Sequence, residues 1–122
     1  MAQIKADFCF AGFVWRGGQY MHMNIYKTVL LDVPGTAVVS LPFEDVQEAK
    51  NNILSIQAQY GNTPTVWYLD FEKTQKDFLL VCLPTGPNVF CNYVSKADYI
   101  GTAFIEEGML VFHYFLTELP TD

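Results

Sequence analysis

The sequence predicts an α+β fold, in which a curved antiparallel sheet of about six to eight strands packs on one long helix. Its 122 residues suit a single domain spanning positions 1–122. One segment carries apolar residues three and four positions apart, which is the spacing of a helix face. Most of the remaining chain consists of short aromatic and β-branched runs separated by Gly, Pro and polar residues, a pattern typical of strands.

Two long strands are predicted in the N-terminal part of the chain. Residues 4–15 are apolar on both alternate sets, which is typical of a strand buried on both faces. The glycine pair at 17–18 supplies the positive φ that a tight turn requires, and residues 20–33 then form the second strand of a hairpin. A Pro-Gly turn leads to a short strand at 37–41.

The helix is predicted over residues 43–60, and Gly61 with Asn62 is expected to end it. Its apolar face consists of side chains that step by three and four, namely Val46, Ala49, Ile53, Ile56 and Tyr60. Its first turns hold Glu44, Asp45 and Glu48, where the helix dipole favours negative charge. We therefore expect this face to pack on the sheet.

From residue 63 onward the pattern predicts a meander of five strands, at 65–72, 77–83, 88–95, 101–105 and 109–117. The first two are expected to pair as a hairpin. In that register Phe71 faces Phe78 and Trp67 faces Cys82, which gives an apolar face able to contact the helix.

Composition excludes several classes of protein. Ten Phe, seven Tyr and two Trp exclude a disordered chain. Thirteen Asp and Glu against seven Lys and Arg, a net charge of −6, disfavour nucleic-acid binding. An odd number of cysteines, no signal-peptide pattern and no apolar run long enough to span a bilayer predict a cytoplasmic protein without membrane contact. We expect no metal and no cofactor.

Motifs for catalysis are weak. Asp70 and Glu72 point the same way on a strand, and a histidine such as His113 beside them would make an acid–base or metal site. Cys82 or Cys91 together with His113 and Asp70 would make a nucleophilic triad. Nothing in the sequence brings these residues together, and nucleophile-elbow and phosphate-loop motifs are missing from it. We predict no catalytic residue and favour a protein that is not an enzyme.

A ligand site is predicted from a row of aromatic hydrogen-bonding groups on one strand face, in a cavity between the helix and the concave sheet. The predicted ligand-binding residues are Tyr20, His22, Tyr26, Trp67 and Tyr68. The same row is also typical of an interface strand or of a strand with a purely structural role.

The favoured function is masking or inhibition of a partner protein, and the chain resembles immunity and inhibitor proteins at the level of class. Electrostatic complementarity favours a basic protein as the partner. The predicted partner-binding residues are Glu44, Asp45, Glu48, Glu106 and Glu107. The apolar content exceeds what one sheet face absorbs, so we expect a second copy of the chain, a partner protein or a ligand inside a closed barrel to cover part of the second face. The alternative function is a small-molecule-binding protein or small enzyme with the cavity described above.

Overall fold

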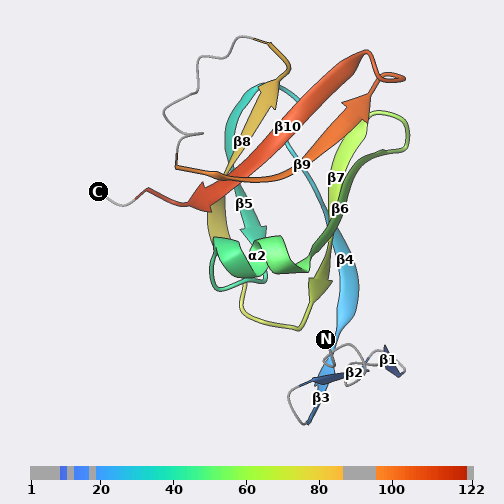
Figure 1. Cartoon of the computed structure of the whole chain (residues 1–122), viewed down its shortest axis with the longest axis vertical. Helices are drawn as coiled ribbons and strands as arrows, with labels where there is room; N and C mark the ends of the chain where they lie inside the picture. Colours follow the sequence, from blue (N-terminus) through green and yellow to red (C-terminus); the bar gives the residue numbers. More distant parts are fainter. Residues whose placement is uncertain (1–8, 11–12, 17–18, 87–95, 121–122) are drawn as a thin grey trace.

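The computed structural model describes residues 9–10, 13–16, 19–86 and 96–120, and the α+β class is confirmed (Figure 1). The described elements are β1 (Cys9–Phe10), β2 (Phe13–Arg16), β3 (Gln19–His22), β4 (Asn24–Val29), β5 (Gly35–Leu41), α2 (Val46–Asn52), β6 (Ile53–Gln59), β7 (Thr63–Asp70), β8 (Lys76–Pro84), β9 (Asp98–Ile105) and β10 (Leu110–Glu118). Among the described residues no helix is long and apolar enough to cross a membrane.

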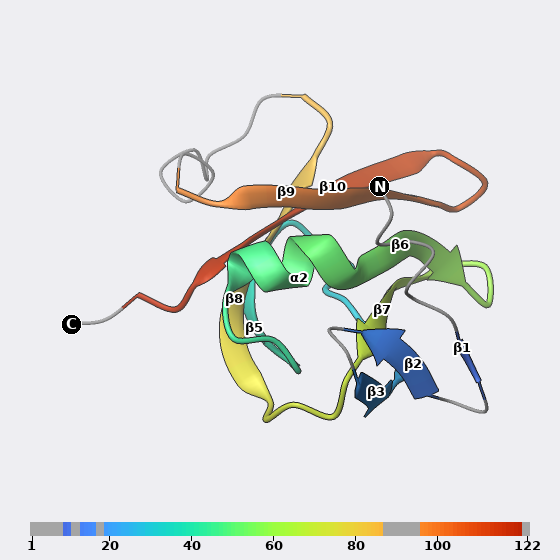
Figure 2. The same ribbon diagram turned by 60° about the horizontal axis from the view of Figure 1, so that its bottom comes forward.

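The strands form three antiparallel sheets rather than the single sheet predicted. Their orders are β1-β2-β3, β4-β7-β6 and β5-β8-β10-β9. The two larger sheets enclose the core, and α2 contacts β7 of one sheet and β10 of the other (Figure 2). The helix therefore closes one end of the core instead of covering a sheet face.

Most predicted strand positions are correct. The structure confirms β5, β7, β8, β9 and β10 within three residues at each end. The predicted hairpin across the glycine pair at 17–18 is confirmed by the antiparallel pairing of β2 with β3. The second strand predicted for that hairpin, 20–33, is interrupted at Met23. The parts before and after Met23 are β3 and β4, which belong to different sheets. The strand predicted at 88–95 and most of that at 4–15 lie outside the described residues.

The predicted hairpin of residues 65–72 and 77–83 is wrong. Both sides of β7 are occupied by β4 and β6, and both sides of β8 by β5 and β10. Strand β7 ends at Asp70, whose carboxylate accepts the N–H of Glu72 at 2.7 Å, and Glu72 has a φ of 63°. This turn directs the chain across to the other sheet. Strand β10 lies between β8 and β9, so the described C-terminal strands are not in meander order.

The predicted helix over 43–60 is too long, because residues 53–59 form β6. Ile53 is already extended, with φ −78° and ψ 126°, while its N–H still bonds to the Ala49 carbonyl. A bulge between Ile53 and Ser55 then shifts the alternation of the strand. As a result Ile53 and Ile56 point to the same side of β6 although they are three residues apart, which imitates the spacing of a helix face. Gly61 and Asn62 form a hairpin turn and not a helix end.

The connection between β4 and β5 is held to the core by two hydrogen bonds. The Leu30 N–H donates to the Pro64 carbonyl at 2.9 Å, and the Leu31 carbonyl accepts the hydroxyl of fully buried Tyr114 at 2.7 Å. The side chain of Leu30 is also buried. This connection joins the two large sheets, so its attachment to the core fixes how the sheets face each other.

Strand β8 is buried on both faces. Phe78, Leu80 and Cys82 belong to the core, while Leu79 and Val81 are also buried although they point to the outer face of the sheet. This explains the continuous apolar run of the strand.

Candidate functional site

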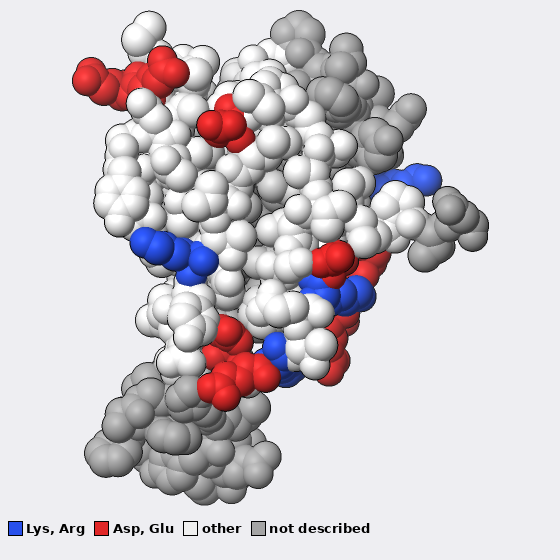
Figure 3. All heavy atoms as spheres, turned by 180° about the vertical axis from the view of Figure 1, so that it is seen from behind, with Lys and Arg blue, Asp and Glu red and all other residues white. Residues whose placement is uncertain are grey.

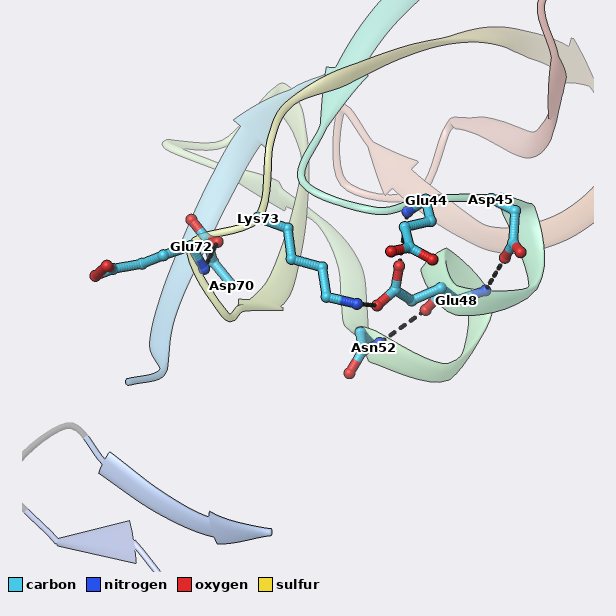
Figure 4. A network of polar contacts seen from close by, with 7 residues as sticks. All are labelled: Glu44, Asp45, Glu48, Asn52, Asp70, Glu72 and Lys73. Carbon is cyan, nitrogen blue, oxygen red and sulfur yellow. Dashed lines mark hydrogen bonds and ion pairs between the residues drawn. The ribbon is translucent and has the colours of Figure 1, made fainter. Parts of the chain in front are cut away.

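The predicted acidic residues at α2 have structural roles. Asp45 is the N-cap and accepts the Glu48 N–H at 2.8 Å. Glu48 accepts the Glu44 N–H at 2.6 Å and forms an ion pair with Lys73 (Figure 4). The hydrogen bond that the Lys73 ammonium donates to the Glu48 carboxylate raises the pKa of Lys73 above its usual value. The acids thus stabilise the first turn of the helix and attach the 71–75 connection to it.

A cavity of about 560 Å³ lies beside this network. Its lining consists of Phe43, Glu44, Glu72, Lys73, Thr74, Gln75 and Lys76. Lys76 donates to the Glu44 carbonyl at 2.8 Å and pairs with Glu118 at 2.6 Å. Because the charges here are mixed and paired with one another, the groove does not present the acidic surface that the sequence predicted.

The structure does not assemble the acid–base site or the triad. His113 lies in the four-stranded sheet, and its Nδ1 and Nε2 are hydrogen-bonded to the hydroxyls of Thr102 at 3.0 Å and Thr85 at 2.8 Å. Asp70 is buried in the other sheet. Within the described ranges no group of three or more His, Cys, Asp or Glu side chains is placed to hold a metal.

Cys82 is a buried, free thiol on the inner face of β8. Burial raises its pKa to about 11, so the thiol is protonated at neutral pH. His113 points to the opposite face, since its neighbour Tyr114 is the residue paired with Cys82. Cys91 lies outside the described residues.

The predicted ligand-binding residues do not share one face. Tyr26 and Tyr68 are cross-strand partners on β4 and β7, and Tyr68 is buried with its ring centroid 5.7 Å from that of Phe43. Trp67 precedes Tyr68 on the strand and points to the other side. The side chains of Tyr20 and His22 lie outside the described part of the chain. None of the five predicted residues lines the cavities of about 560, 450 and 380 Å³ in the described part of the chain.

Glu106 and Glu107 lie where two hairpins meet at one end of the molecule (Figure 1). The β6–β7 turn and the β9–β10 turn are joined by a 2.7 Å hydrogen bond from the Glu106 N–H to the Asn62 side-chain oxygen. We call this surface the paired tip; it consists of Tyr60, Gly61, Asn62, Glu106, Glu107, Gly108 and Met109. A cavity of about 380 Å³ lies between the two turns and is lined by five of these residues.

The paired tip combines exposed apolar side chains with free acids. Tyr60 is 87% exposed and Met109 is 83% exposed. Glu106 and Glu107 are exposed, and no ion pair involves either of them in the described structure. Acidic side chains project from this end of the molecule in the view from behind (Figure 3). Unlike the acids at α2, these are available to a partner.

The backbone of the paired tip is strained. Tyr60, Glu106 and Glu107 have φ values of 54°, 50° and 59°, and they are three of the four non-glycine residues with positive φ in the described structure. Each such residue costs about 1–2 kcal/mol relative to ordinary backbone. Backbone strain of this kind concentrates at binding and catalytic sites.

Sequence reasoning identified Glu106 and Glu107 but missed Tyr60, which it assigned to the helix, and Met109, which it assigned to a strand. A tyrosine directly before Gly61-Asn62 was the available signal, since Asn and Gly favour turns. The chain was also compared with protein-family models, with curated proteins and with solved structures, and none of the three comparisons gave a match.

Proposed function

We propose that this protein is a small acidic binding module that masks a partner protein and contacts it through the paired tip. The observation that carries the proposal is the exposure of Tyr60 and Met109 beside the unpaired carboxylates of Glu106 and Glu107. Aromatic and Met side chains are enriched at the centres of protein interfaces, and a charged rim around them guides association.

The chemistry of the paired tip favours a basic partner. The chain carries a net charge of −6, so its field attracts cationic proteins and repels acidic ones. Glu106 and Glu107 would pair with Lys or Arg of the partner, while Tyr60 and Met109 would fill an apolar hollow next to those cations. A basic active site or nucleic-acid-binding surface has this combination. Masking such a surface requires no catalytic residue in the module itself.

The acidic residues at α2 are the alternative surface through which the module could contact its partner. Glu48 is paired with Lys73, and Asp45 caps the helix, so binding a partner there would disturb contacts that hold the fold. The predicted small-molecule site stays a prediction; the separation of Trp67 from Tyr68 on opposite faces of β7 gives it no support.

The test is affinity capture from a lysate of the protein's own source, with quantitative mass spectrometry. Three baits are compared: the unchanged chain, Glu107→Gln and Glu44→Gln. The two variants each remove one exposed negative charge, one in the paired tip and one near α2. We expect a basic protein to be enriched by the unchanged chain and by Glu44→Gln, and to be reduced with Glu107→Gln.

Raising the salt concentration should weaken the capture, because the attraction of exposed charges is screened. Equal capture of the partner by all three baits, or a stronger loss with Glu44→Gln, would contradict the assignment to the paired tip. Capture that does not depend on salt would contradict the electrostatic argument.

A further inference from the structure

Strand β5 forms an open edge of the four-stranded sheet. Among the described strands it pairs only with β8, in a continuous register from Gly35 opposite Cys82 to Leu41 opposite Lys76. The backbone N–H and C=O groups of alternate β5 residues therefore point away from the sheet with no ladder partner in the described chain. Such an edge is a template for one more strand.

This edge lacks the features that usually prevent strand addition. The seven residues of β5, Gly35–Leu41, contain no charged residue and no proline, and their pairing with β8 has no bulge. Val38 at the centre is 59% exposed, and Thr36 and Ser40 on the same face are also exposed. Strand β4, an edge of the three-stranded sheet β4-β7-β6, carries Lys27, a typical protecting residue.

From this edge we infer that two copies of the chain pair through β5, antiparallel and about a two-fold axis at Val38. The full overlap of the two strands sets Val38 opposite its own copy, Thr36 opposite Ser40 and Ala37 opposite Val39. Every one of these pairs is neutral, so no like charges meet. The result is a continuous eight-stranded sheet, an isologous contact that closes on itself.

The self-complementary register, in which every pair is neutral, identifies a second copy as the occupant that fits this edge. A chain of net charge −6 repels itself, so self-association needs a surface without charges. A basic partner finds no acid on β5 to bind. Strand β9, which leads into the paired tip, is at the opposite edge of the same sheet. A dimer through β5 therefore leaves both paired tips available, and the inference does not depend on the proposed function.

Analytical ultracentrifugation over a concentration series tests the inference. We expect the unchanged chain to form a dimer and no larger species. Val38→Lys and Val38→Glu should each raise the dissociation constant by about tenfold or more, because each variant places two like charges opposite one another at the axis. An equimolar mixture of the two variants should restore a dimer, since the introduced lysine of one chain then faces the introduced glutamate of the other across the axis.

Val29→Lys is the matched control, because Val29 is equally exposed but lies on β4. It should leave the dimer intact, and circular dichroism should show that all variants are folded. A monomer at every concentration, a mixture that stays monomeric, or disruption by Val29→Lys equal to that by Val38→Lys would each overturn the inference.

Discussion

The replacement of Tyr114 by Phe tests how the two large sheets are held together. The hydroxyl of this fully buried side chain donates to the Leu31 carbonyl at 2.7 Å, within the connection from β4 to β5. Removing it leaves a carbonyl without its hydrogen-bond donor and a small void where the oxygen was. A buried polar group left unsatisfied costs about 1–3 kcal/mol, so we expect the free energy of unfolding to fall by that amount.

Urea denaturation followed by circular dichroism measures the change, with the slope against urea expected to stay constant. Tyr99→Phe is the matched control, because its hydroxyl also makes a hydrogen bond, to Thr102 at 2.5 Å, but the side chain is exposed. We expect it to cost less than about 0.5 kcal/mol. A loss of similar size for both variants would refute the argument that Tyr114 fixes the connection.

Four further predictions follow from the core, the helix and the paired tip. Burial raises the pKa of Cys82 from 9.0 to about 11, so the folded state holds this proton more tightly than the unfolded state. The stabilisation from this group is therefore fully present below pH 9 and is lost as the pH rises to 11. In Cys82→Ala the free energy of unfolding should fall less over this pH range, as measured by denaturation curves at each pH. A Cβ on Gly101 would lie 2.7 Å from Ile56 Cδ1. Gly101→Ala should thus cost about 1–3 kcal/mol in urea denaturation, and less in an Ile56→Ala background. Asp45→Ala should cost about 1 kcal/mol by the same assay, through loss of the N-cap. Glu107→Gly should stabilise the fold by about 0.5–1 kcal/mol, because relief of the positive φ exceeds the added entropy of the unfolded chain, while partner capture falls.

Local patterns predicted the strands well because each strand depends on its own alternation and its own turns. The strands β5 and β7 to β10 were each located within three residues. The helix was misjudged because one bulge placed Ile53 and Ile56 on the same side of a strand at helical spacing. No local pattern reveals such a bulge, since it is a feature of the register between β6 and β7, a strand later in the chain.

Pairing between strands was harder to predict than their positions. Adjacent strands usually pair, and that rule led to the wrong hairpin of residues 65–72 and 77–83. The structure separates them because Asp70 and Glu72 form a turn that leaves the first sheet, and β4 and β6 already flank β7. The difficulty of predicting which strands and hairpins lie side by side also limited the prediction of the paired tip. Glu106 and Glu107 were found from their own turn, whereas Tyr60 reaches them only through the contact of two hairpins.

The amino acids found at the positive-φ positions of the paired tip indicate that their side chains have a binding role. Turns with positive φ are most easily formed by Gly or Asn, which adopt this backbone at little cost. The chain has glycine with positive φ at Gly61 and Gly108, yet Tyr60, Glu106 and Glu107 also adopt positive φ in the same two turns. No burial offsets that cost, because these side chains are exposed. The unfavourable backbone is explained if the aromatic ring and the two carboxylates are what the paired tip presents to a partner.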